Sequence, residues 1–185
     1  MKTLPPFPVL TINESISLRE HAPTDAEAFF NYYTHPKVTE FNIAAPTPKT
    51  LQEAKEEVMY CRSLYYQGQG IYWAICEQPN PAMIGAIGIH LRSQHHGEIH
   101  YDLDVNYWNR GIMTQAMDTA ITYCFEQMNL TTLEARTLKA NIASIRILEK
   151  MGFKHDHCIE KYTSYTGQQY TIEVYQLHQG QYLTR

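Results

Sequence analysis

A short stretch of the chain places four acidic or imidazole side chains at alternate positions, where they could move protons or bind an amine. These side chains are Glu98, His100, Asp102 and Asp104. The residues between them are apolar, so the stretch has the period-two pattern of a β-strand with one covered face. The alternative is a strand whose polar face only meets solvent.

The polar stretch leads through a turn containing Gly111 into the pattern of an amphipathic helix. From Ile112 onward the apolar residues recur about every four positions, so one stripe of the helix faces a core. The first amides of a helix lack intrahelical partners and the helix dipole favours negative charge there, so this order of elements predicts an anion site. Gly111 would let a ligand approach the backbone. The alternative is a glycine turn that only redirects the chain.

Several other functions are disfavoured by composition and motifs. Neither Gly-x-x-x-x-Gly-Lys-Ser/Thr nor Gly-x-Gly-x-x-Gly occurs, which argues against nucleotide hydrolysis and hydride transfer. A net charge of −4, with scattered Lys and Arg, gives no footprint for nucleic acid. The four cysteines form no Cys-x-x-Cys pair, so we predict neither a zinc site nor a disulfide framework.

A second segment downstream strengthens the interpretation of the turn. ANIASIRILEKMGF, at residues 140–153, follows the strand-like TTLEARTLK. Together with WNRGIMT at residues 108–114, it resembles the GCN5-related N-acetyltransferase (GNAT) superfamily. Motif A of that superfamily is a strand, a pyrophosphate-binding turn and a helix, and motif B is a strand, an Asn and a helix ending in Gly-Phe. YWNRGIMTQA is similar to the RimJ/RimL branch, which acetylates N-terminal amines of ribosomal proteins.

The resemblance extends from about residue 15 to about residue 178 and implies the fold. It implies a mixed α/β domain whose central sheet has about seven mostly antiparallel strands, a splayed parallel pair and about four helices. We predict this acetyltransferase domain over residues 15–180, after an N-terminal extension at 1–14. The first ten residues lack the apolar run of a signal peptide or membrane span, so we expect a cytoplasmic protein with no membrane partner. We also expect a monomer or a homodimer.

Local patterns predict the elements around the two motifs. We expect a helix from Thr24 or Asp25 to just before Pro36, and a second helix that begins at Thr50. The expected strands lie at residues 15–20, 71–77, 83–91 and 98–105, with a turn at 79–81 and a final hairpin around 164–167.

The resemblance implies acetyl-coenzyme A as co-substrate, with no metal. Its pyrophosphate would bind the backbone of the turn and of the helix start, at Arg110, Gly111, Ile112, Met113 and Thr114. The Arg110 side chain could add a charge-assisted contact to a phosphate. The pantetheine arm would run beside Leu103, Asp104 and Val105 and would meet Asn141. The alternatives are a solvated arginine and an asparagine that only starts a helix.

The resemblance also suggests the catalytic groups. Glu98, at the start of the strand, is predicted to be the base, and His100 and Asp102 either replace it or bind the acceptor amine. Many family members carry a Tyr seven residues after the motif B Asn, but this chain has Leu148 there. In the family, that Tyr protonates the departing thiolate. We therefore predict that Ser144 takes the role of general acid toward the sulfur, with a purely capping serine as the alternative.

The acceptor is predicted to be a primary amine, most simply a peptide or protein N-terminus. An α-amine with a pKa near 7.8 is about one-tenth neutral at pH 7, whereas a lysine amine is below about one-thousandth neutral. A small amine such as a polyamine, amino acid or aminoglycoside is an alternative, and a coenzyme A-binding sensor without chemistry is another. We expect acceptor contacts from residues 41–50 and from the last hairpin, including Tyr162 and Tyr165.

Overall fold

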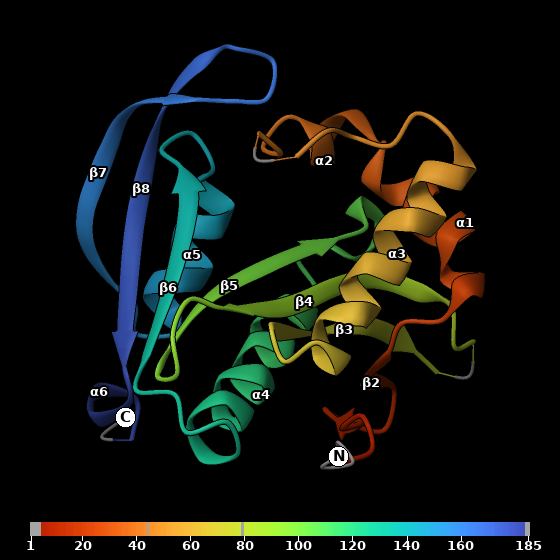
Figure 1. Cartoon of the computed structure of the whole chain (residues 1–185), viewed down its shortest axis with the longest axis horizontal. Helices are drawn as coiled ribbons and strands as arrows, with labels where there is room; N and C mark the ends of the chain where they lie inside the picture. Colours follow the sequence, from red (N-terminus) through yellow and green to blue (C-terminus); the bar gives the residue numbers. More distant parts are fainter. Residues whose placement is uncertain (1–4, 44, 79, 184–185) are drawn as a thin grey trace.

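One twisted sheet organises the chain, and helices cover both of its faces (Figure 1). The computed structural model describes residues 5–43, 45–78 and 80–183. Within these residues the strand order is β1-β2-β3-β4-β5-β6-β8-β7, and every neighbouring pair is antiparallel except β5 with β6. The strands are β1 (Leu10–Thr11), β2 (Ile16–Glu20), β3 (Gly70–Glu77), β4 (Met83–Leu91), β5 (His96–Leu103), β6 (Thr132–Leu138), β7 (Lys154–Thr163) and β8 (Gln169–His178).

Two helical layers enclose the middle of the sheet. The helices are α1 (Ala26–Tyr33), α2 (Pro36–Thr39), α3 (Leu51–Tyr66), α4 (Ile112–Glu126), α5 (Ile142–Lys150) and α6 (Gln179–Tyr182), with short 3₁₀ turns at Pro23–Asp25 and Val105–Tyr107. On one face, Phe29 of α1 and Val58 of α3 pack with Ala74 of β3. On the other face, Trp73 and Ile87 pack with the buried side of α4.

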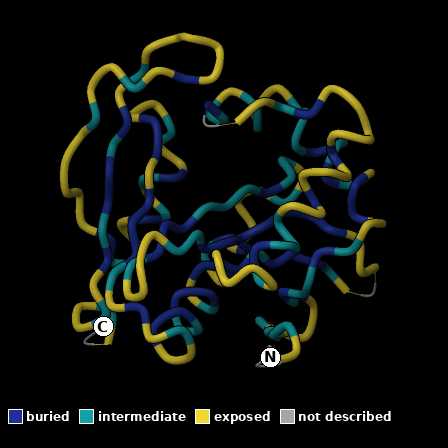
Figure 2. The backbone as a smooth tube through the Cα atoms, viewed as in Figure 1, coloured by how far each residue is buried: buried dark blue, intermediate teal, exposed yellow. Residues whose placement is uncertain are grey.

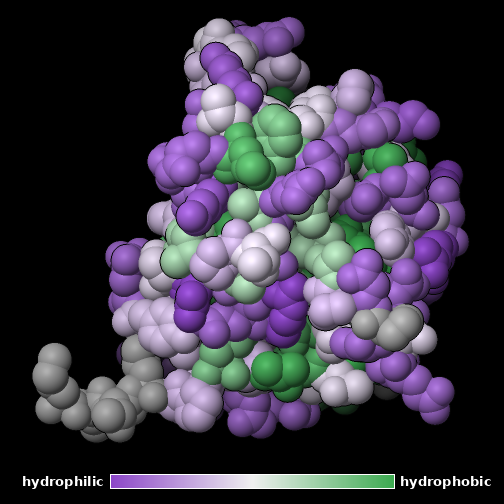
Figure 3. All heavy atoms as spheres, turned by 90° about the vertical axis from the view of Figure 1, so that its right-hand side faces the viewer, coloured by the Kyte–Doolittle hydropathy of each residue, from purple (hydrophilic) through white to green (hydrophobic). Residues whose placement is uncertain are grey.

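The alternation along the central strands explains why both faces are covered. In β3, Trp73 points into the α4 core while its neighbour Ala74 points into the α1 and α3 core. β4 is buried from Met83 to Ile89, as the doubly apolar sequence predicts. Figure 2 shows this buried centre and, in contrast, the exposed edge strand β7. The surface over α1 and α3 in Figure 3 is largely hydrophilic, with hydrophobic side chains only in scattered groups.

The predicted mixed fold is confirmed, with differences in its shorter elements. Eight strands and six α-helices are described instead of about seven and four, because β1 has two residues and α2 and α6 have four each. The hairpin around residues 164–167 and the Thr50 cap are confirmed, since Thr50 accepts a bond from the Glu53 amide at 3.1 Å. Residues 1–4, 44 and 79 of the predicted extension, loop and turn lie outside the described residues.

One predicted capping bond and one predicted boundary are wrong. Asp25 directly precedes α1 as predicted, but its side chain does not cap the helix, because its carboxylate accepts from the Ala22 amide at 2.7 Å and pairs with Arg19 at 2.7 Å. The strand predicted to end at 105 ends at Leu103. The next residue, Asp104, turns the chain by accepting from the Asn106 amide at 2.9 Å, and this starts a 3₁₀ turn.

Candidate active site

The parallel pair in the sheet opens after four residue pairs. β5 and β6 are paired from His96 with Thr132 to Ile99 with Ala135. Beyond this point β5 continues along β4 to Leu103, and β6 continues along β8 to Leu138. Among the described residues, the facing edges of the two strands therefore have no strand partner beyond Ile99, so their backbone groups are available to a ligand.

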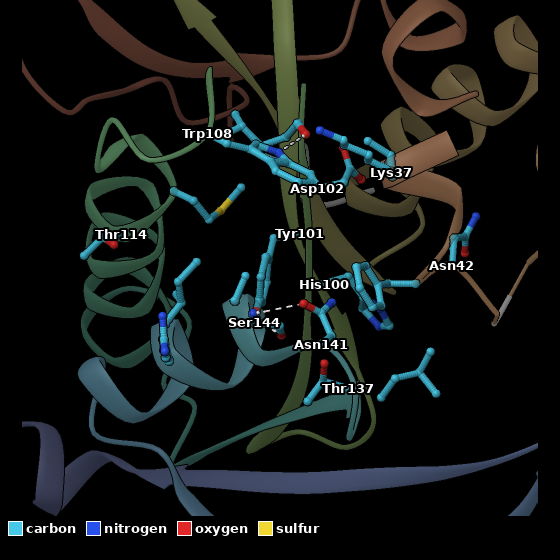
Figure 4. A pocket seen from close by; sticks show the side chains of 18 of the residues that line it. Lys37, Asn42, His100, Tyr101, Asp102, Trp108, Thr114, Thr137, Asn141 and Ser144 are labelled. Atoms are coloured by element: carbon cyan, nitrogen blue, oxygen red, sulfur yellow. Dashed lines mark hydrogen bonds between the residues drawn. The ribbon is translucent and has the colours of Figure 1, made fainter. Parts of the chain in front are cut away.

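A cavity of about 560 Å³ occupies this opening. Its walls come from the end of β5, the turn before α4, the start of α4, the end of β6, α5 and the segment around α2 (Figure 4). Both faces of the sheet contribute, because Tyr101 contacts Ser144 on α5 whereas its neighbour Asp102 contacts Tyr32 on α1. The cavity thus joins the α4 and α5 side of the sheet to the α1 side.

The helix start next to the cavity has the features of an anion site. Gly111 is the N-cap of α4 with φ of +74°, a left-handed conformation that favours glycine. The first amide to bond back into the helix is that of Gln115, which donates to the Gly111 carbonyl at 3.1 Å. The three amides of Ile112, Met113 and Thr114 precede it and belong to residues that line the cavity. The predicted order of strand, turn and helix is confirmed, and the predicted anion remains a prediction.

The remaining residues predicted along the cofactor lie in different places. Arg110 is outside the cavity wall: its guanidinium bonds Glu77 at 2.6 Å and lies 5.0 Å from the centre of the Tyr107 ring. Leu103 lines the cavity, whereas Asp104, which caps the 3₁₀ turn, and Val105, which begins it, do not.

Trp108 fixes this turn against the end of the strand. Its indole N–H donates to the Leu103 carbonyl at 2.8 Å. The indole is also part of the cavity wall. The tryptophan before the glycine turn is therefore a structural tie between β5 and the approach to α4.

Glu98 is buried and ion-paired and does not line the cavity. Only 3% of its surface is exposed, and its carboxylate accepts from Arg92 Nε at 2.8 Å. Burial acts to raise the pKa of Glu98, but nearby positive groups outweigh it and lower the pKa. Because burial also lowers the pKa of His100 to about 4, that imidazole is neutral at pH 7, so Arg92 and Arg136 provide the positive charge. Glu98 is held ionised and away from the cavity surface.

His100 and Asp102 both line the cavity. The His100 ring lies 3.3 Å from Glu98 (Nε2 to Oε1) and stacks on Tyr72, with ring centres 6.2 Å apart. Asp102 is accessible only in part and accepts from the Tyr32 hydroxyl at 2.6 Å. Burial raises the pKa of Asp102 to about 6, although the bonds from Tyr32 and the Ala86 backbone act in the opposite direction. The same burial raises the pKa of Tyr32 well above 10, so Tyr32 stays a donor.

The start of α5 brings a third polar group to the cavity. The side-chain carbonyl of Asn141 accepts from the Ser144 amide at 3.1 Å and so caps the helix, which leaves the side-chain nitrogen of Asn141 outside that bond. The backbone N–H of Asn141 donates to the Leu138 carbonyl at 2.9 Å. The Ser144 hydroxyl is 2.7 Å from that of Tyr101. Asn141, Ser144 and Tyr101 lie side by side in Figure 4.

The sequence interpretation missed Tyr101 and Tyr32. The period-two pattern assigned Tyr101 to the apolar face, which is correct for its ring but overlooks a hydroxyl that reaches α5. Tyr32 is far from Asp102 in the sequence and is buried, so the sequence pattern showed only its place on a helix. A buried tyrosine normally bonds its hydroxyl to a partner, and that was the available signal.

The two tyrosines predicted to touch the acceptor do not line the cavity. Tyr162 packs beside the cluster of Ile43, Leu138, Ile172 and Val174, whereas Tyr165 is half exposed in the hairpin turn. That hairpin reaches toward the loop that carries α2 (Figure 1). Their predicted contact with a substrate remains a prediction.

Other features concern ions and membranes. In the described part of the chain, no three His, Cys, Asp or Glu side chains form a group that could hold a metal ion. All four cysteines are free thiols. None of the described helices has the length and apolarity to span a bilayer.

Comparison with known proteins gives a consistent family. The family model described as acetyltransferase (GNAT) domain matches residues 15–154. YoaA of Bacillus subtilis, an uncharacterized N-acetyltransferase, is 29% identical over 173 residues, which are 92% of this chain and 97% of YoaA. Two solved structures share the fold at 16% identity. RimL, the ribosomal L7/L12 alpha-N-protein acetyltransferase, has a TM-score of 0.82 over 93% of this chain and 94% of its own. The microcin C7 self-immunity acetyltransferase MccE, solved with acetyl-CoA and AMP, has a TM-score of 0.80 over 90% and 94%.

Proposed function

The chain belongs to the GNAT acetyltransferase family, and we propose that it transfers the acetyl group of acetyl-coenzyme A to the α-amine of a peptide or protein N-terminus. The observation that carries the proposal is the position of the Asp102 carboxyl group, which lines the cavity and accepts from the Tyr32 hydroxyl at 2.6 Å. Burial at this position raises the pKa of Asp102 to about 6. A general base works best when its pKa lies near the working pH.

The properties of Asp102 favour an α-amine as acceptor. An α-ammonium group with a pKa near 7.8 must lose its proton before it can attack, and transfer to Asp102 crosses a gap of about 2 pKa units. A lysine-like or polyamine ammonium near 10.4 would leave a gap of more than about 4 units. Asp102 is therefore matched to the weaker acceptor base.

The charge of the cavity also argues against a polycationic acceptor. Among the described residues of its wall, Asp102 is the single carboxylate; Lys37 and Arg146 are cationic, and Arg136 is paired with Glu134 at 2.8 Å. Of the three acidic residues that left a polyamine or aminoglycoside open, Glu98 is paired with arginine and Asp104 caps a turn. A substrate with several positive charges would therefore find only one carboxylate in the described wall of this cavity, and no acidic cluster to bind it.

Acetyl-coenzyme A fits the other half of the cavity. The free amides at the start of α4 suit a pyrophosphate, and Arg146 lines the same cavity with a positive charge. The unpaired edges of β5 and β6 suit an extended arm with amide groups, and the side-chain nitrogen of Asn141, which takes no part in the capping bond, can donate to that arm. MccE, which has the same fold, was solved with acetyl-CoA bound.

In the proposed reaction Asp102 accepts a proton from the α-ammonium group. The neutral amine then attacks the thioester carbonyl, the C–N bond forms, the C–S bond breaks, and the sulfur leaves as a thiolate. The nitrogen releases its second proton to water as the neutral amide forms. Ser144 faces the cavity from α5 and supplies a hydroxyl to that sulfur. Tyr32 keeps Asp102 oriented from the opposite side through its 2.6 Å bond.

A thiol-release assay over matched acceptors tests this function. One peptide has a free N-terminus and no lysine; its partner has the same sequence with an acetylated N-terminus and one internal lysine. Spermidine and kanamycin complete the panel. We expect kcat/KM for the free N-terminus to exceed the others by at least about 100-fold, in line with the neutral fractions of the two amine types. A faster reaction with spermidine or kanamycin would overturn the α-amine proposal. Binding of acetyl-coenzyme A in calorimetry without turnover of any acceptor would instead indicate the sensor.

A further inference from the structure

Tyr101 is a polar group of the cavity to which the family resemblance assigns no role. It lies on β5 at the point where the strand has separated from β6. Its ring is directed toward α5, and its hydroxyl is 2.7 Å from the Ser144 hydroxyl (Figure 4). Both residues line the cavity, and Ser144 is only 8% exposed.

We propose that Tyr101 is a positioning residue, which donates to the Ser144 oxygen and thereby directs the serine hydrogen at the departing sulfur. Two hydroxyl groups at 2.7 Å can share their bond in either direction. A phenol is the stronger donor of the two. When Tyr101 donates, the serine hydrogen is free to point into the cavity. The serine amide is already fixed by Asn141, so the tyrosine bond fixes what remains free, the rotation of the hydroxyl.

The pair is suited to stabilise a thiolate and unsuited to protonate it. Burial raises the pKa of Tyr101 to about 12, against the lowering effect of its bond with Ser144. A thiol has a pKa near 8.5, so moving the tyrosine proton to the sulfur would be unfavourable by more than about 3 pKa units. A hydrogen bond to an ionised acceptor needs no proton transfer and is about twice as strong as a neutral one. Ser144 therefore acts as a hydrogen-bond donor here, whereas the sequence suggested a proton source.

Tyr101 supplies a phenol hydroxyl to a helix that lacks the motif B tyrosine of many family members. Leu148 is fully buried against the core, one turn beyond Ser144, and offers no polar atom. Tyr101 brings a phenol to the same helix from the strand opposite. The inference requires only the acetyl transfer of the family, because any acceptor that the wild-type protein acetylates can be used to test it.

A double-mutant cycle tests the coupling between the two hydroxyl groups. Ser144→Ala should lower kcat about 100-fold, the size reported for loss of one donor to a developing anion. Tyr101→Phe should lower kcat about tenfold, because the serine remains but rotates freely. The double variant should be no slower than Ser144→Ala, since the tyrosine acts only through the serine. KM for acetyl-coenzyme A should stay within twofold in all three.

Tyr123→Phe is the matched control. Tyr123 also lies beside the core, where its ring packs on Trp73, but it is not in the cavity wall. Its loss of a hydroxyl should leave kcat unchanged. Urea unfolding of each variant separates a folding defect from a catalytic one.

Two results would overturn the proposal. Full kcat in Tyr101→Phe would show that the serine needs no orientation. Multiplied losses in the double variant would show that the tyrosine acts independently of the serine. If the wild-type protein acetylated no acceptor, that result would instead refute the proposed function, and it would be seen before any variant is made.

Discussion

Asp102→Asn should make the folded protein more stable at neutral pH and at the same time slow the reaction. Burial raises the pKa of Asp102 from 3.8 to about 6, so its negative charge is disfavoured in the folded protein. A pKa difference of that size corresponds to about 3 kcal/mol at pH 7.5. Asparagine removes the charge but keeps an oxygen that can accept from Tyr32.

The sign and the pH range follow from linkage. The folded protein holds the Asp102 proton more tightly than the unfolded chain does, so the favourable contribution of this carboxyl is complete below about pH 4. It is lost as the pH rises through about 6. The stability gained by Asp102→Asn should therefore be near 3 kcal/mol at pH 7.5 and about half of that at pH 5.

Urea unfolding of the variant and the wild-type protein at these two pH values measures the effect. Asp156→Asn is the control, because Asp156 is exposed on β7 outside the cavity, and it should show no such gain. A variant that is less stable than wild type at pH 7.5, or equally shifted at both pH values, would refute the claim that the charge is disfavoured.

The same variant tests catalysis. Wild-type kcat/KM should rise as the pH passes about 6, where Asp102 becomes ionised. In Asp102→Asn this limb should disappear, and kcat/KM at pH 7.5 should fall about 100-fold, the lower range for loss of a general base. An unchanged pH profile would remove Asp102 from the role of base. A gain in stability joined to a loss of activity is typical of a group placed for function.

Three further changes probe other parts of the structure. Glu98→Gln removes the buried carboxylate that pairs with Arg92 and should lower the free energy of unfolding in urea by about 2 kcal/mol. The pH profile of kcat/KM should still rise near pH 6, and loss of that rise would make Glu98 the base. Gly111→Ala puts a side chain at φ of +74° and should destabilise by about 1 kcal/mol and weaken acetyl-coenzyme A binding in calorimetry, whereas unchanged affinity would contradict the anion site. Thr50→Ala removes the α3 cap and should lower stability by about 1 kcal/mol with full activity; an intact melting temperature would show that the cap is redundant.

Helices and strands with a regular sequence pattern could be predicted from the sequence, whereas the contacts that shape the site could not. The strand Met83–Leu91 and the Thr50 helix start follow from local alternation and capping, so their predictions are confirmed. The end of β5 depends on Asp104 bonding its own neighbour, and no periodicity reveals that competition between strand and turn.

The acidic residues show the same division. Alternation correctly put Glu98 and Asp102 on one strand but could not separate their environments. Glu98 meets Arg92, six residues earlier along the same hairpin, whereas Asp102 meets Tyr32, seventy residues away. The different ionisation of these two carboxyls is therefore a product of tertiary contacts that pattern analysis does not contain.

The short pairing of β5 with β6 makes the sheet two half-sheets joined by a seam of four residue pairs. One half contains β1 to β5 and the other contains β6 to β8. A ligand that bonds to both strands beyond the seam would hold the two half-sheets together, so ligand binding should slow amide hydrogen exchange in both halves. At a ligand concentration of 100 times Kd, such linkage is worth about 2.7 kcal/mol. The opening that admits the substrate thus also makes the rigidity of the protein depend on what it holds.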